Sequence, residues 1–298
     1  MKIRKSSIAA AVATLAAFSL ISVSTPAIAA NPSLLVWVNQ DRKAIFTGPI
    51  NDWAKANNVD VTIVGKSFGT VRDALKTAVP AGTGPDVLIA APHDWTGNLK
   101  AAAVIQPLRL STATTSQLTK ASLQGFTLGN QLYGVPFWTE NIALVRSLKS
   151  APKAPTTAAG MKAGDLAVAS WESDNGQIPY HFYPIQASFG APVFEKTSRG
   201  WTSTLAMDGP EGSAFAQYLN SKGKKFFAGT GWDSNVCGIK SGKLKYWITG
   251  PWAITSLEEG NSSCPTKTNK SVINKDFAVS AIPSFGGKVA TPFLGVQG

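Results

Sequence analysis

The chain has 298 residues, of which 44% are hydrophobic and 15% charged, with 27 glycines, 18 prolines and nine tryptophans. This composition excludes a disordered tail, a collagen-like repeat and a disulfide-framework miniprotein, and the length is sufficient for one or two hydrophobic cores. The 28 basic and 17 acidic residues give a formal net charge of +11. They form no basic helix or nucleic-acid motif, so we expect a solvated basic surface and no nucleic-acid partner.

The first residues have the pattern of an export signal. Basic residues precede an apolar run over 8–23 and the small-residue site Ala27-Ile28-Ala29. We interpret residues 1–29 as a secretory signal peptide that is cleaved near Ala29 or Ala30. The run is Ala-rich and shorter than the ~20 strongly apolar residues of a membrane span, and no cysteine near the cleavage site could carry a lipid anchor. We therefore expect a soluble, extracytoplasmic mature protein.

Strand and helix patterns alternate after the leader. Short apolar or alternating runs predict strands, and longer stretches between them predict helices. Such an alternation indicates βαβ units and a mostly parallel sheet. The expected elements are strands at residues 34–38, 59–64 and 86–90 and helices at residues 45–56 and 70–79.

The second half is less regular and contains no internal repeat. Residues 134–138 and 142–145 have extended patterns, and residues 150–155 resemble a surface linker. Two α/β lobes, with the chain crossing between them near residues 135–145, are the simplest architecture. The further elements expected are helices at residues 183–188 and 211–221 and strands at residues 243–249 and 277–282.

The two cysteines, Cys237 and Cys264, form an isolated pair. In an exported protein such a pair favours a disulfide over two separate thiols. Its loop-closure entropy would contribute on the order of 3 kcal/mol. His93 and His181 have no metal-ligand spacing to either cysteine, so we expect no metal and no other cofactor.

A serine hydrolase is the leading enzyme alternative. The segment Gly65-Lys66-Ser67-Phe68-Gly69 matches G-x-S-x-G and lies between a predicted strand and a predicted helix. No oxyanion segment precedes it, so a Gly/Ser turn is the more economical interpretation. A triad would take Ser67 as nucleophile, His93 or His181 as base, and Asp86 or Asp94 as its partner.

Aromatic residues accompany acids or turns at several points where predicted strands end. The apolar faces of sugar rings stack on Trp and Tyr, and sugar hydroxyls need carboxylate and guanidinium partners. Ligands of open α/β sheets bind beyond the carboxyl ends of strands, so this pattern favours a carbohydrate cleft. A glycosidase using Asp94 and Glu140 is a second enzyme alternative. The segments are His93-Asp94-Trp95, Trp138-Thr139-Glu140-Asn141, Pro179-Tyr180 and Gly250-Pro251-Trp252.

An ordered set of segments carries a family resemblance. It comprises Leu35-Val36-Trp37-Val38-Asn39 with Asp41-Arg42, Gly84-Pro85-Asp86-Val87, His93-Asp94, Tyr133-Gly134-Val135-Pro136 with Glu140, Pro179-Tyr180, Ile248-Thr249-Gly250-Pro251-Trp252, Ile282-Pro283-Ser284-Phe285 and Pro292-Phe293-Leu294-Gly295-Val296. With these segments the chain resembles the maltose/maltodextrin-binding proteins of bacterial ABC transporters, which are family-1 extracellular solute-binding proteins.

The resemblance implies a non-enzymatic, monomeric protein with a two-lobe, type II-like periplasmic-binding-protein fold. Such a protein closes on an oligosaccharide by hinge motion and delivers it to a membrane permease. The implied lobes are residues 30–138 and 139–293, and residues 294–298 begin a second hinge crossing. Matching residues for sugar hydroxyls are Asp41, Arg42, Asp94 and Glu140. Tyr180 and Trp252 match stacking aromatics, Trp232 lies where another is expected, and Trp95 is a further candidate.

The chain departs from the family pattern at three positions and at its end. Trp95 follows His-Asp where enteric members carry Arg, Ala91 stands where they place a stacking Trp, and Ile178 precedes Pro-Tyr where they place Glu. These changes keep the sugar class and leave the individual sugar open. About a hundred further residues would complete the fold, so we expect a truncated product or an incomplete reading frame that lacks the return segment and the C-terminal helices.

Overall fold

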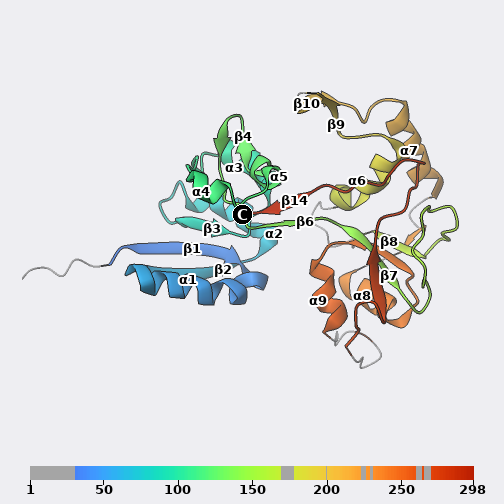
Figure 1. Ribbon diagram of the computed structural model, residues 1–298, viewed down its shortest axis with the longest axis horizontal. Helices are drawn as coiled ribbons and strands as arrows, with labels where there is room; N and C mark the ends of the chain where they lie inside the picture. The colour runs from blue at the N-terminus through green and yellow to red at the C-terminus, as the bar shows by residue number, and fades with distance from the viewer. Residues whose placement is uncertain are drawn as a thin grey trace, which may run out of the picture.

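The computed structural model consists of two α/β lobes joined by extended segments (Figure 1). It describes residues 31–168, 178–198, 200–222, 226–228, 231–259, 264 and 270–298. The predicted signal peptide lies outside these residues. In the described part of the chain, no helix has the length and apolar character needed to cross a membrane.

The first lobe is built on a three-stranded parallel sheet of order β2-β1-β3. Because β1 is central, it is the strand with the most continuous apolar run, and Val38 is fully buried. The strands are β1 (Ser33–Asn39), β2 (Asp60–Lys66) and β3 (Val87–Ile89), with the small hairpin β4 (Thr127–Leu128) and β5 (Gln131–Leu132). The helices are α1 (Lys43–Asn57), α2 (Phe68–Ala78), α3 (Thr96–Ala101), α4 (Thr112–Thr115) and α5 (Lys120–Gly125), with single 3-10 turns at Gln40–Arg42 and His93–Trp95.

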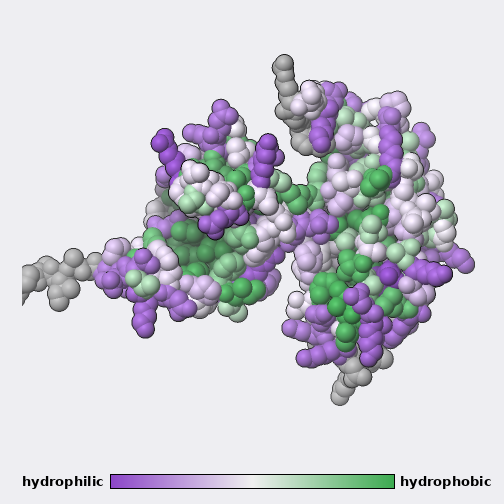
Figure 2. Space-filling view, viewed as in Figure 1, coloured by the Kyte–Doolittle hydropathy of each residue, from purple (hydrophilic) through white to green (hydrophobic). Residues whose placement is uncertain are grey.

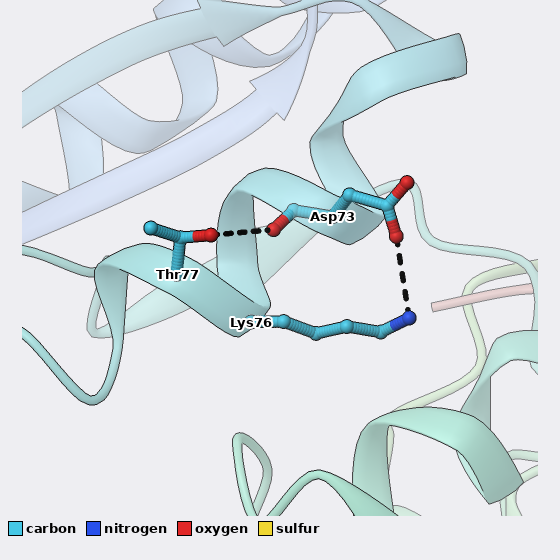
Figure 3. A network of polar contacts seen from close by, with 3 residues as sticks. All are labelled: Asp73, Lys76 and Thr77. Atoms are coloured by element: carbon cyan, nitrogen blue, oxygen red, sulfur yellow. Dashed lines mark hydrogen bonds and ion pairs between the residues drawn. The ribbon is translucent and has the colours of Figure 1, made fainter.

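Helix α2 packs one face against this sheet and exposes the other. Val71 and Leu75, four positions apart, are buried in the core that also contains Trp37 of β1. On the outer face, the ammonium of Lys76 lies 3.2 Å from the carboxylate of Asp73, and the Thr77 hydroxyl donates to the Asp73 carbonyl (Figure 3). An exposed pair of this spacing contributes about 0.2–0.5 kcal/mol, so burial of the inner face holds the helix in place.

The second lobe contains a five-stranded mixed sheet of order β11-β8-β12-β7-β13. Strands β11, β8 and β12 are parallel, whereas β7 pairs antiparallel with both β12 and β13. The strands are β7 (Ala143–Ser147), β8 (Leu166–Val168), β11 (Phe227–Ala228), β12 (Tyr246–Thr249) and β13 (Phe277–Ser280), with the separate hairpin β9 (Phe194–Thr197) and β10 (Gly200–Leu205). The helices are α6 (Ile178–Phe189), α7 (Pro210–Lys222), α8 (Trp232–Ser241) and α9 (Trp252–Glu258).

Both faces of this sheet are covered. On β12, Ile248 belongs to one apolar core and Trp247 to the other, and Leu144 and Val145 on β7 divide in the same way. Successive strand residues point to opposite faces, so these continuous apolar runs are the pattern of a sheet buried on both sides. The turn that starts α9 is thereby held at the carboxyl end of β12.

Two segments far apart in the sequence connect the lobes. Strand β6 (Trp138–Glu140) pairs antiparallel with β14 (Gly295–Gln297), and Figure 1 shows both between the lobes. Beyond β14, Gly298 exchanges two backbone hydrogen bonds of 2.9 and 3.0 Å with Ala91 in the first lobe. The β6–β14 pair is therefore tied to the loop that follows β3.

A disulfide joins Cys237 on α8 to Cys264, with a Cα–Cα distance of 5.2 Å. Both residues contact the apolar core around Trp247. The indole of Trp232 donates a 3.3 Å hydrogen bond to the Ser256 hydroxyl on α9. The disulfide thus ties α8 to the chain beyond α9, and the hydrogen bond ties α8 to α9 itself.

The expected elements correspond to observed ones, with several differences in the second lobe. The helix expected at residues 183–188 is α6, which begins at Ile178, and the strand expected at residues 277–282 is β13, which ends at Ser280. The strand predicted at residues 243–249 begins at Tyr246, because the Leu244 amide donates to the Gly238 carbonyl and closes the turn after α8. The parallel sheet expected from the first half is parallel in the first lobe, whereas the larger sheet of the second lobe is mixed.

Candidate functional site

A cavity of about 880 Å³ lies between the two lobes. Its volume is in the range of small-molecule sites, and Figure 2 shows the hollow that separates the lobes beside the connecting segments. The lining comes from the start of α2, the turn after β3, the two connecting strands, α6 and the start of α9. The cavity thus collects residues from the ends of several strands, as the sequence predicts.

The turn after β3 supplies the wall of the first lobe. Asp94 is exposed and lines the cavity, whereas Trp95 is largely buried and packs on Phe68, with ring centroids 5.0 Å apart. The guanidinium of Arg72 lies 5.8 Å from the Trp95 ring and also lines the cavity. The turn is fixed by His93, whose Nδ1 accepts a 3.2 Å hydrogen bond from the Val296 amide. It therefore combines a carboxylate with a guanidinium and an aromatic surface.

The connecting strands form the floor of the cavity. Glu140 on β6 and Gln297 on β14 both line it. The amide Nε2 of Gln297 donates a 2.9 Å hydrogen bond to Oε1 of Glu140. Only one carboxylate oxygen of Glu140 is engaged by this bond, so the other can accept hydrogen bonds from a ligand.

Asp41 and Arg42 lie beside this floor and are not among the described residues that line the cavity. Arg42 places its guanidinium 4.6 Å over the ring of Trp138 on β6. Burial lowers the pKa of Arg42, and the charges of Glu140 and Asp41 oppose that shift. An arginine remains protonated in such surroundings, so this part of the cleft holds a positive group next to two carboxylates.

The second lobe contributes an aromatic wall. Tyr180 and Tyr183 on α6 stack on Phe293, with centroid distances of 6.1 and 3.6 Å, and all three rings line the cavity together with Trp252. Burial first, and then the charges of Glu140 and Asp94, raise the pKa of Tyr180 to about 12. The phenol is therefore a stable hydrogen-bond donor that faces both carboxylates.

The indole of Trp252 occupies space that a glycine leaves open. It starts α9 directly after Gly250 and Pro251 and is half-buried. A Cβ at position 250 would lie 2.3 Å from the indole ring. Gly250 is therefore required for the position of Trp252 at the cavity.

Trp232 lies away from this wall. Its ring packs edge to face against Trp247, at a centroid distance of 5.1 Å, and it is not among the described residues of the cavity lining. Trp232, expected among the ligand-facing aromatics, is half-buried on α8 and contacts Trp247 of β12 and Ser256 of α9. A single tryptophan gives no local signal that separates these two roles.

Several residues that line the cavity are not among the site residues predicted from the sequence. Phe293 and Gln297 reach the cavity through the β6–β14 pairing, which no local pattern reports. Arg72 and Phe68 come from the first turns of α2. The signal for them in the sequence is the strand-to-helix turn at residues 65–69, which starts α2 at the cavity.

The structure bears on the serine-hydrolase alternative, whereas both carboxylates of the glycosidase alternative, Asp94 and Glu140, line the cavity. Ser67 makes no side-chain capping hydrogen bond at the start of α2, and Nδ1 of His93 is occupied by the Val296 amide. No group of three potential metal ligands gathers in the described part of the chain. A triad at Ser67 is therefore not assembled in this structure.

Comparisons with known proteins identify relatives of this arrangement. The model of the family described as bacterial extracellular solute-binding protein matches residues 37–298. The galactooligosaccharide-binding protein of Bacillus subtilis is 25% identical over 89% of this chain and 63% of its own length. The maltotriose-binding protein of Pyrococcus abyssi is 25% identical over 67% of this chain and 45% of its own. The chain thus spans less than two thirds of these curated relatives.

Solved structures share the fold. The Thermus thermophilus maltotriose binding protein, bound with maltotriose, superposes with a TM-score of 0.69 at 22% identity, over 89% of this chain and 71% of that one. The maltose-maltodextrin binding protein of Alicyclobacillus acidocaldarius gives a TM-score of 0.71 at 22% identity, over 89% and 70%. These likenesses establish the two-lobe periplasmic-binding-protein fold, as the sequence resemblance implies.

Proposed function

Because the chain belongs to the bacterial extracellular solute-binding protein family, we propose that it captures an oligosaccharide between its lobes and delivers it to an ABC import permease. The protein acts by binding and lobe closure and catalyses no reaction. Residues 1–29 direct its export as a signal peptide and are then cleaved. The mature protein is a monomer that works outside the cytoplasm. Its lobes comprise residues 30–138 and 139–293, and residues 294–298 belong to the second crossing.

The observation that carries this proposal is the chemistry of the cavity. Tyr180 and Trp252 offer aromatic surfaces from the second lobe, while Asp94 and Glu140 present carboxylates from the first lobe and the floor. Sugars are apolar on their ring faces and polar at their hydroxyl rims. A sugar between these walls would stack on the rings and donate its hydroxyls to the carboxylates.

The connection between the lobes suits hinge closure. In the part of the chain that the structure describes, β6 and β14 form the paired link described above, and a short link of this kind absorbs large backbone changes during domain closure. The relatives named for galactooligosaccharide and maltotriose support a neutral oligosaccharide as ligand. The departures at Ala91, Trp95 and Ile178 leave the choice between these sugars to experiment.

Titration calorimetry with maltotriose and with a galactosyl-lactose trisaccharide tests the proposal. We expect saturable binding of at least one sugar by the exported chain, with no product released on long incubation. Trp252→Ala should weaken binding by about tenfold to a hundredfold, because it removes a stacking surface. Trp53→Ala is the matched control, since Trp53 is 49% exposed on α1 and is not among the described cavity residues.

Two results would overturn the proposal. One is the absence of binding of any oligosaccharide by a folded chain. The other is the release of hydrolysis products by the purified protein, which would favour the glycosidase that uses Asp94 and Glu140.

A further inference from the structure

Two buried polar atoms near the cavity floor have no hydrogen-bond partner among the described residues. They are Nη1 of Arg42, a donor, and Oε1 of Gln297, an acceptor. Gln297 is only 5% exposed and lines the cavity. Buried polar atoms in native proteins are nearly always paired, so each of these needs a partner.

Both residues neighbour Trp138. Gln297 is the register partner of Trp138 in the β6–β14 pair, and the Arg42 guanidinium lies 4.6 Å over the Trp138 ring. The Nε2 of Gln297 is already committed to Glu140. What remains on this side of the floor is one unused donor and one unused acceptor.

A sugar hydroxyl can donate a hydrogen bond to the unused acceptor of Gln297, which lines the cavity. We infer that Gln297 is a ligand-binding residue, whose Oε1 accepts a hydrogen bond from one sugar hydroxyl. The inference rests on the proposed function and adds a residue that the family resemblance does not assign. A site that pairs its buried groups with a hydroxyl discriminates strongly against an analogue that lacks it.

The contact also places the sugar on the second crossing segment. The bond from Gln297 to Glu140 joins β14 to β6, and Gly298 ties the end of β14 to the loop after β3. A hydroxyl held by Gln297 therefore contacts the segment that must bend when the lobes close.

The test measures maltotriose and its set of mono-deoxy analogues by calorimetry on the exported chain. The variants are Gln297→Leu and Arg42→Met, and Thr139→Val is the matched control because Thr139 is exposed between Trp138 and Glu140 and points to the other face of β6. We expect Gln297→Leu to weaken maltotriose about tenfold. One deoxy analogue should bind wild type and Gln297→Leu equally, and Arg42→Met, which changes no residue of the cavity lining, should discriminate against that analogue as wild type does. Thr139→Val should bind like wild type.

Each other result overturns the assignment. If wild type binds maltotriose and Gln297→Leu binds it equally well, Gln297 does not touch the sugar. If Gln297→Leu weakens all analogues by one factor and keeps their ranking, Gln297 only holds the hinge. A folded wild type that binds no oligosaccharide overturns the proposed function, and this assignment with it.

Discussion

Removing the disulfide should weaken the second lobe without unfolding it. Cys237 lies half-buried on α8, and Cys264 is buried against the same core. The double substitution of both cysteines by alanine deletes the covalent link and little apolar surface. The packing of Trp232 on Trp247 still holds α8 to β12, and the hydrogen bond from Trp232 to Ser256 holds α8 to α9.

The magnitude follows from the length of the closed loop. The two cysteines are separated by 27 residues, and for a loop of that length the chain-entropy relation gives about 12 cal/mol/K, or about 3.6 kcal/mol at 25 °C. This entropy is restored to the unfolded chain when the link is cut. The free energy of unfolding of the second lobe should therefore fall by about 3–4 kcal/mol, which is a large fraction of the stability of an ordinary domain.

Urea denaturation with hydrogen exchange measures this loss and locates it. Amides of α8 and β12 should exchange faster in the variant, while those of α2 in the first lobe should be unchanged. Wild type treated with dithiothreitol should match the variant. The reasoning is refuted if the oxidised, reduced and substituted chains unfold within about 0.5 kcal/mol of one another, or if protection is lost equally in both lobes.

Three further predictions concern the cleft. The pKa of Tyr180 is raised to about 12, so its contribution to the free energy of unfolding is complete below pH 10 and declines as the pH rises toward 12. Tyr180→Phe should reduce that decline, as measured by urea denaturation at a series of pH values across this range. Gly250→Ala should displace Trp252 and weaken sugar binding in calorimetry to a similar extent as Trp252→Ala, because the added Cβ collides with the ring. Ser67→Ala should change sugar affinity less than about twofold and unfolding by less than about 0.5 kcal/mol, since its side chain makes no capping hydrogen bond; a larger loss of affinity would show that Ser67 contacts the ligand.

The parallel strands and the two long helices of the first lobe were predictable because their signals are local. A central parallel strand is buried on both faces, so β1 appears in the sequence as an unbroken apolar run around Trp37. Helix α2 shows its buried face through Val71 and Leu75, which recur at helical spacing. In both elements the residues that form the apolar pattern are also the residues that form the core. Tertiary contacts therefore favour the same secondary structure as the local sequence.

In the second lobe, hydrophobic periodicity does not predict the short elements. Strand β8 has three residues and helix α9 has seven, which is too few for either period to stand out. Their structure depends on partners elsewhere, such as β12 for β8 and the core around Trp247 for α9. Trp232 shows the same limit at the level of one residue, because its place in the core is set by α9 and not by its neighbours in sequence.

The cavity floor depends both on a local sequence feature, a glycine, and on the pairing of distant segments. Glu140 and Gln297 are 157 residues apart, and nothing in either segment announces the pairing of β6 with β14. A Cβ at Gly295 would nevertheless lie 2.9 Å from Cγ of Glu140 and 3.3 Å from the Tyr180 hydroxyl. The missing side chain lets the two crossing strands and α6 converge, so that the carboxylate, the phenol and the amide share one cavity. Gly295 thus contributes to the site through its lack of a side chain, and this role can be recognised only once the partner strand is known.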